Sequence, residues 1–456
     1  MAPRKTRSKY DCDISLFQPE PPVAERLVKS LFAGRDAELQ KGYKILLRHL
    51  DISGSRSKGF DKKPWVIHGE SRSGKSHLAR RILAEFKAKP QRIKMLIPAR
   101  EKIEALLVMA DLFGQLVGEF RRLTSDDRLS PPVKDLPDIR LVDDLIEQMR
   151  LFLDTAQSAT ITRERSDEAT LEVGGELSGL LGKLLGKYQS RDANKQTRQV
   201  VLKPPTPERL AEVCGVIVEK LMQYKLAEHL LVLVDDVDLL DYSAASPQQA
   251  RVQRSLLTDA LCTLHGQPGV DVVLTARSWF VYSGKVLTQL VDLTQSVLSP
   301  EALVEIHNNH IRQFATKAGV ERFLTPEGLQ EFANEMQELN GLPGVFLQHL
   351  HTAFDRYKDD SDFTERDYEW FVDVFRKLVA ALRSRCELAV SMIEEATRNG
   401  QLHMRVTEGN NPFIGTAFDN LLVFQSYHDE RCYFTSPLVR RIFTNPRTVS
   451  GPGDGL

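Results

Sequence analysis

The sequence predicts an α/β protein in which helices flank a parallel sheet. The first observation is a glycine-rich octapeptide, residues 69–76, that lies between a strand-like and a helix-like segment. The second is a pair of apolar runs, residues 230–234 and 272–274, each followed by polar residues. Continuous apolar runs of this length are typical of parallel strands buried on both faces. A single sheet with helices between its strands accommodates all three segments.

The octapeptide fits the phosphate-binding pattern G-x-x-x-x-G-K-[ST] at every fixed position. A short apolar run, residues 65–68, precedes it, and apolar residues recur at helical spacing from Leu78 to Phe86. The loop therefore leads into a helix N-terminus, where unpaired backbone NH groups and a positive dipole favour phosphate. The sequence predicts a nucleoside triphosphate site formed by Gly69, Glu70, Ser71, Arg72, Ser73, Gly74, Lys75 and Ser76, followed by His77.

Each fixed residue of this loop has a chemical role. Gly69 and Gly74 let the main chain turn tightly and approach the phosphates. Lys75 reaches the terminal phosphates, and the Ser76 hydroxyl can ligate Mg²⁺. The alternative is a Gly/Ser-rich turn with a helix cap, and the strand-loop-helix context favours the phosphate site.

Acidic residues follow the second apolar run, which ends in Asp235, Asp236, Val237 and Asp238. Because carboxylates at the exit of a parallel strand lie beside a phosphate loop, we assign Asp235 to the metal ion and Asp236 to the attacking water. Asp238 is more typical of a cap or loop acid. The alternative for the pair is a strand followed by an acidic turn.

A cationic residue, Arg277, follows the third strand-like run. A side chain that leaves the strand next to the metal strand can sense the terminal phosphate, so Arg277 is our sensor candidate. The alternative is a solvated arginine.

Composition limits the class of protein. The chain has 456 residues with 42% apolar content, and this size predicts two or three domains. Its net charge is −1, so any contact with nucleic acid must come from local basic patches. No apolar run is long enough to cross a membrane, and no apolar stretch follows the basic N-terminus. We expect a soluble, reduced, cytoplasmic protein without structural zinc, because no C-x-x-C pair occurs among Cys12, Cys214, Cys262, Cys386 and Cys432.

An insertion lies between the loop and the acids. Lys75 and Asp235 are 160 positions apart (235 − 75), whereas one strand-helix unit needs roughly 30 residues. The inserted residues lie at about 124–207. Their sequence predicts a helix over 141–153 and short strands at 159–161, 171–173 and 199–203. A Leu/Gly-rich helical segment is predicted over 177–188. The basic stretch from Lys183 to Lys203 has three interpretations: a solvated hairpin, a partner-docking or ring-forming element, or a nucleic-acid loop.

In the C-terminal third, the sequence predicts several helices followed by a β-hairpin. Helices begin at Pro300, at Thr325-Pro326, near residue 344 and at Thr364. Two short apolar runs, over 421–427 and 432–435, then flank a polar turn. This hairpin after helices is typical of the wing of a winged helix.

Five segments in this order resemble one group of ATPases. Residues 32–39, the phosphate loop, residues 235–238, residues 275–277 and residues 341–343 are similar to motifs of the AAA+ initiator ATPases of origin-recognition type and of the STAND signalling ATPases. The resemblance implies a core of five parallel strands, a helical lid and a C-terminal winged helix. It also implies that Gly34 and Arg35 lie near adenine and that Pro343 closes the lid over it.

The domains implied are an N-terminal arm over 1–29, a core over 30–299 with the insertion at about 124–207, a lid over 300–360 and a C-terminal helical or winged-helix domain over 361–456. Arg277 stands where initiators commonly carry Asn, and the paired acids are Asp-Asp rather than Asp-Glu, which favours the STAND side. The lid motif lacks the arginine that initiators usually place there.

Two functions compete. The first is a switch that binds and hydrolyses ATP with Mg²⁺, controls its own assembly into a homo-oligomer, and engages a protein effector from another chain, as in bacterial defence or signalling. The second is a DNA-engaging AAA+ ATPase for replication initiation, transposition or partitioning. A small-molecule kinase sharing only the loop is disfavoured by the separate lid.

Overall fold

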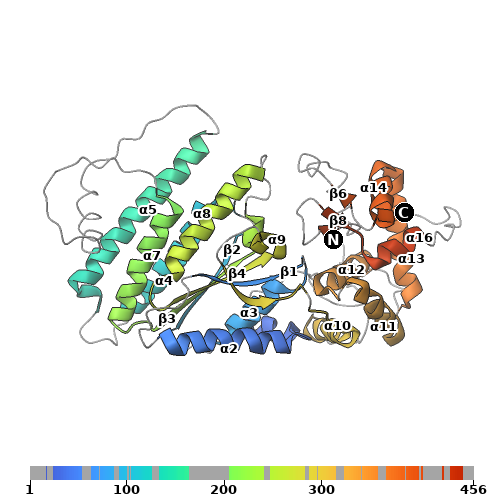
Figure 1. Cartoon of the computed structure of the whole chain (residues 1–456), viewed down its shortest axis with the longest axis horizontal. Coiled ribbons are helices and arrows are strands. Elements are labelled where there is room, and N and C mark those ends of the chain that lie inside the picture. The colour runs from blue at the N-terminus through green and yellow to red at the C-terminus, as the bar shows by residue number, and fades with distance from the viewer. Residues whose placement is uncertain are drawn as a thin grey trace, which may run out of the picture. The chain divides into compact units, whose positions relative to one another are not determined.

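The structure is a computed structural model (Figure 1). It describes residues 17, 24–53, 63–70, 72–86, 92–99, 102, 104–125, 133–163, 205–240, 247–282, 287–294, 296–314, 323–339, 341–357, 366–385, 387–399, 402–403, 424–425 and 432–444. The chain divides into two compact units. The first comprises Met1–His49, Trp65–Lys87 and Val273–Leu456, and the second comprises Leu50–Pro64 and Ala88–Val272.

A five-stranded parallel sheet has the order β2-β3-β4-β1-β5, which confirms the predicted fold class. The two predicted apolar runs form β3 and β4, and every residue of both strands is buried. The strands are β1 (Trp65–Gly69), β2 (Arg92–Pro98), β3 (His229–Asp235), β4 (Val270–Arg277) and β5 (Thr288–Asp292).

In the first unit, helices on both sides of the phosphate loop in the sequence pack together. The side chains of Ile82 and Val291 lie so close to Gly42 that a Cβ there would be 2.6 Å from Ile82 and 3.2 Å from Val291. A larger residue at this position would have to shift the Ile82 side chain. The helices up to the end of the sheet are α1 (Glu25–Leu31), α2 (Asp36–Ser53), α3 (Lys75–Glu85) and α9 (Ser278–Tyr282).

The C-terminal part of this unit is helical with a small sheet, as the sequence predicts. Thr325 accepts a bond from the Gly328 amide as the predicted N-cap, but the cap of α13 is Asp367, whose Oδ1 accepts from Trp370 N at 2.8 Å. Thr364 lies outside the described residues. The helices are α10 (Pro300–Phe314), α11 (Pro326–Glu335), η3 (Met336–Leu339), α12 (Pro343–Tyr357), α13 (Tyr368–Arg385), α14 (Glu387–Asn399) and α16 (Pro437–Thr444).

The predicted C-terminal hairpin is confirmed. β7 (Phe424–Gln425) pairs antiparallel with β8 (Cys432–Phe434). A further strand that the sequence analysis did not predict, β6 (Leu402–His403), pairs with the other edge of β8. The helix α16 begins three residues after β8 ends.

One hydrophobic core joins the helices of the expected lid to those of the expected C-terminal domain. It also contains Phe17, from the expected N-terminal arm, which is fully buried. The Phe17 ring lies 5.4 Å from the ring of His307 and 5.8 Å from that of Phe354, centroid to centroid. Full burial of a phenylalanine contributes about 1.5–3 kcal/mol, so Phe17 fixes this point of the N-terminal segment to the helices.

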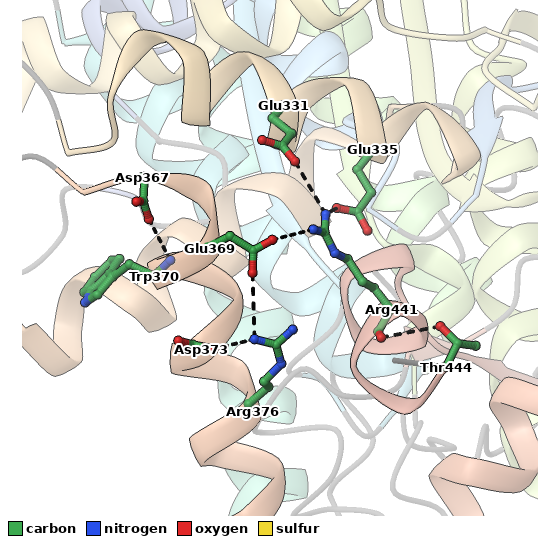
Figure 2. Close-up of polar contacts among 9 residues, drawn as sticks. All are labelled: Glu331, Glu335, Asp367, Glu369, Trp370, Asp373, Arg376, Arg441 and Thr444. Atoms are coloured by element: carbon green, nitrogen blue, oxygen red, sulfur yellow. Dashed lines mark hydrogen bonds and ion pairs between the residues drawn. The ribbon is translucent and has the colours of Figure 1, made fainter. Parts of the chain in front are cut away.

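A cluster of charges ties α16 to the preceding helices (Figure 2). The Arg441 guanidinium lies 2.6 Å from a Glu369 carboxylate oxygen, 3.6 Å from Glu331 and 3.7 Å from Glu335. It also lies over the Tyr368 ring at 5.1 Å. One arginine therefore bridges α11, α13 and α16. Burial raises the pKa of Glu335 to about 7 against the opposing effect of Arg441.

In the second unit, α4, α7 and α8 pack on one another, and α5 packs on α7 (Figure 1). The helix predicted over 141–153 is longer, because α5 continues to Arg163; the strand predicted at 159–161 is therefore wrong. The segments 171–173, 177–188 and 199–203 lie outside the described residues. The helices are α4 (Ala105–Thr124), η1 (Val133–Asp135), α5 (Pro137–Arg163), α7 (Pro207–Gln223), η2 (Val237–Leu239) and α8 (Pro247–His265). None of the described helices has the length and apolar character that a membrane crossing requires.

Buried histidines predict acid sensitivity of the first unit. Burial lowers the pKa of His307 to about 4 and of His349 to about 3, from 6.5. Between pH 6.5 and 4 the unfolded chain binds these protons and the folded chain does not, so stability falls as pH falls, by about 1.4 kcal/mol per pH unit for each histidine.

Replacing His307 with Phe removes one titrating group and keeps an aromatic ring beside Phe17. Urea unfolding between pH 4.5 and 6 should then show a slope smaller by about 1.4 kcal/mol per pH unit. An unchanged slope would contradict the assignment of a buried, neutral His307.

Candidate functional site

The phosphate loop has the backbone that close approach of an anion requires. Gly74 has φ +90° and Arg72 has φ +63°, both in the left-handed region, and α3 begins at Lys75. The Lys75 side chain is buried and its Nζ donates to the Glu70 carbonyl at 2.6 Å, across the loop. Ser71 lies outside the described residues. Successive amides in such turns form an anion-binding concavity.

The start of α12 lies against this loop. The Gly344 amide donates to the Arg72 carbonyl at 3.0 Å. A Cβ built at Gly344 would lie 2.8 Å from Arg72 Cβ, and a Cβ built at Gly74 would lie 3.4 Å from Pro343 Cγ. The predicted lid residue Pro343 is thus placed at the loop, in contact range of its second glycine.

Arg35 lies beside the same glycine. Gly34, with φ +74°, turns the chain between α1 and α2. The buried Arg35 guanidinium donates to the hydroxyl and, at 3.4 Å, to the carbonyl of Ser296, and also faces Glu38. Its Nε is buried without a hydrogen-bond partner among the described residues, and lies 4.0 Å from the Cβ position of Gly74. An unmatched buried donor at this place is available to a ligand of the loop.

Arg277 ends β4 directly beside the loop. In the pairing of β1 with β4, Arg277 is the partner of Gly69, the first glycine of the loop. It is 8% exposed. Its location at the carboxyl end of a strand adjacent to β1 is the location expected for a sensor of the terminal phosphate.

His77 holds the first turn of α3 to α1. Its Nε2 lies 2.9 Å from the Val28 carbonyl, and its ring packs edge-on against Phe32 at 5.4 Å. Burial lowers the pKa of His77 to about 4, so the neutral ring donates this bond. The imidazole therefore orients the phosphate-loop helix.

The candidate acids belong to the second unit. Asp235 ends β3 and is buried, and its carbonyl accepts from the Ala99 amide at 2.9 Å. Asp236 has φ +56° and precedes η2, which contains Asp238. A left-handed non-glycine residue is uncommon, although Asp tolerates it, and such strain gathers at functional positions.

The structure thus places the loop, Arg35, Arg277 and Pro343 together in the first unit. Sequence reasoning missed three residues there: His68, Ser278 and Asp292, whose side chains meet below the loop. The one signal was a histidine inside an otherwise apolar strand. Among the described residues, no group of three or more His, Cys, Asp or Glu side chains forms a metal site of its own.

No protein-family model and no curated protein matches the sequence. Among solved structures, the chain is similar to Cdc6p from Pyrobaculum aerophilum, with 11% identity, a TM-score of 0.38, and coverage of 95% of this chain and 97% of that one. It is also similar to the ORC2 protein of Aeropyrum pernix, solved in ADPNP and ADP complexes, with 12% identity, a TM-score of 0.42, and coverage of 95% and 98%.

The contact between α12 and the loop predicts that adding a methyl group at Gly344 destabilises the folded protein. Gly344→Ala places a Cβ against the Arg72 backbone and must displace α12 or the loop, so it should lower the thermal unfolding midpoint by several degrees. Gly118→Ala is the matched control, because a Cβ at this helical position meets nothing within 4 Å. It should leave the midpoint unchanged or raise it. Equal midpoints for the two variants would contradict the described packing.

Proposed function

We propose that this chain is an AAA+/STAND-type ATPase that binds ATP with Mg²⁺ and hydrolyses it. The observation that carries the proposal is the arrangement of the first unit around the phosphate loop. A loop with two left-handed residues leads into α3 at the buried Lys75, while Arg277 pairs with Gly69 and α12 bonds to Arg72. The series of sequence motifs supports the AAA+/STAND assignment over that of a phosphate-binding turn.

The loop would hold the phosphates and Lys75 would contact the terminal ones. The ammonium that now donates to the Glu70 carbonyl can turn to a phosphate oxygen, which is a stronger, charge-assisted acceptor. The unmatched Nε of Arg35 supports a role for Gly34 and Arg35 in holding the nucleoside, under the lid residue Pro343.

Ser76 and Asp235 each have the donor chemistry that Mg²⁺ prefers. A hydroxyl on the first turn of α3, from Ser76, and a buried carboxylate at the end of β3, from Asp235, are hard oxygen donors, and Mg²⁺ keeps several waters beside one or two such ligands. The ion would neutralise charge on the phosphate oxygens.

Asp236 would orient the attacking water. Its left-handed backbone fixes the direction in which its carboxylate leaves the chain after β3. Arg277, with Lys75, would stabilise the charge that develops on the transferred phosphoryl group. The lid contributes Pro343 and Gly344 rather than an arginine, which supports slow turnover or turnover that needs a partner.

The output we propose is a nucleotide switch. ATP held between loop and α12 would fix the C-terminal helices against the loop, and hydrolysis would release them. The chain would act as a homo-oligomer that engages an effector from another chain, in a bacterial defence or signalling system. The shared core of lid and C-terminal helices supports the transmission of such a change.

A second candidate is a DNA-engaging ATPase. The three-stranded sheet β6-β8-β7 that accompanies α13, α14 and α16 favours it, because a small sheet beside helices is how a wing is built. Binding to duplex DNA at two salt concentrations tests it, since phosphate contacts weaken steeply with salt. Absence of salt-dependent binding would contradict the DNA-engaging candidate and leave the nucleotide switch.

Lys75→Ala should abolish ATP binding, because it removes the ammonium group that the motif directs at the terminal phosphates. Calorimetric titration with ATP and Mg²⁺ measures this, with Lys29→Ala as the control: Lys29 is an exposed lysine paired with Glu25. Wild-type affinity of Lys75→Ala for ATP would contradict the proposed function.

Asp236→Asn should leave ATP affinity within about twofold and lower turnover by at least 100-fold, because the amide cannot accept the water's proton. Asn is chosen since it tolerates the left-handed backbone as Asp does. Phosphate release measures turnover. Hydrolysis at the wild-type rate would show that another residue activates the water.

A further inference from the structure

His68 lies in the strand that ends at the phosphate loop. It is 1% exposed and immediately precedes Gly69. In the sheet it is the partner of Ala276 on β4 and of Asp292 on β5. Its carbonyl accepts from the Leu293 amide at 2.7 Å. A histidine therefore lies on β1, between β4 and β5, near the end of all three strands.

The imidazole contacts the residue that follows β4, Ser278, and the last residue of β5, Asp292. Its Nδ1 lies 3.3 Å from the Ser278 hydroxyl and 3.6 Å from a carboxylate oxygen of Asp292. The same carboxylate oxygen accepts from the amide and the hydroxyl of Thr294, at 2.8 and 2.6 Å. The side chain thus bridges the end of β4 and the end of β5 beneath the loop.

Burial lowers the pKa of His68, an effect that Lys75 reinforces and that Asp292 and Gln289 oppose. The ring is therefore neutral at neutral pH, and it acts through its hydrogen bond rather than as a charge. Ser278 itself is fully buried, so its hydroxyl needs a partner of this kind.

Arg277 is the residue held between these contacts. Its backbone pairs with Gly69, and the next residue is the one that His68 bonds. We propose that His68 is a positioning residue for ATP hydrolysis, which through Ser278 fixes the end of β4 and so aims Arg277 at the terminal phosphate. The proposal rests on the proposed ATPase function.

The physical reason is the sensitivity of a charge-stabilising side chain to its position. A displacement of about 1 Å in a catalytic constellation can cost on the order of 100-fold in rate. Without the hydrogen bond from His68, the Ser278 side chain at the start of α9 is no longer held in place. The residue that directly follows Arg277 is then less fixed, and so is Arg277. ATP binding depends on the loop and Lys75 and stays intact.

The test compares His68→Leu and Ser278→Ala with Arg277→Ala. Each of the first two should lower kcat about 10-fold while the Kd for ATP changes less than twofold. The double variant His68→Leu/Arg277→Ala should be no slower than Arg277→Ala, because His68 acts through Arg277. His68→Asn should recover most of the rate, since its amide takes the place of Nδ1. Additive losses in the double variant would overturn the proposal.

The matched control is a second buried His-Ser pair in the same unit. His349 Nε2 lies 2.9 Å from the Ser436 hydroxyl, which also caps α16 by accepting from the Val439 amide at 3.3 Å. Ser436→Ala should lower stability and leave kcat unchanged. A kcat loss equal to that of Ser278→Ala would show a general effect of destabilisation and refute the assignment.

A second readout needs no turnover. His68→Leu should speed amide hydrogen exchange over residues 277–280, where β4 ends and α9 begins, at least several-fold, whereas Ser436→Ala should not. Unchanged exchange contradicts the positioning role even if ATP is hydrolysed. Absence of hydrolysis by the wild type, with faster exchange in His68→Leu, contradicts only the proposed ATPase function.

Discussion

The left-handed backbone of the phosphate loop is the constraint on which the candidate site depends. At Arg72 and Gly74 the chain takes φ values of +63° and +90°, and the Arg72 carbonyl accepts from the Gly344 amide at 3.0 Å. An L-residue in this conformation is held at a cost of about 1–2 kcal/mol, which the surrounding contacts must offset. The loop and the start of α12 therefore specify each other's position, and a nucleotide that reshapes the loop must also act on α12.

The helix α12 extends this coupling to the C-terminal helices of the same unit. Gly344 at its start contacts the loop, and His349, farther along it, bonds Ser436, which caps α16. Arg441 then ties α16 to α11 and α13 (Figure 2). Because these helices share one core, a displacement of α12 at the loop also acts on the helices packed against it. This continuity supports the proposed nucleotide switch.

Local signals predicted much of this fold. The loop pattern, the apolar runs of β3 and β4, the cap at Thr325 and the C-terminal hairpin are each set by neighbouring residues, so the sequence reveals them. The continuation of α5 to Arg163 was missed because its β-branched end, Thr160 to Thr162, favours strands when taken alone. Burial of Phe17, the Arg72 to Gly344 bond and the contacts of His68 join positions remote in the sequence, which no single-sequence pattern encodes.

We infer that the loop and the start of α12 form one ATP-responsive contact. Amide hydrogen exchange of residues 341–347, with and without ATP and Mg²⁺, tests it most directly, with α5 as the internal reference. ATP should slow exchange at the Gly344 amide and its neighbours at least 10-fold and leave exchange in α5 unchanged. Exchange at 341–347 that stays the same while ATP protects the loop would contradict it.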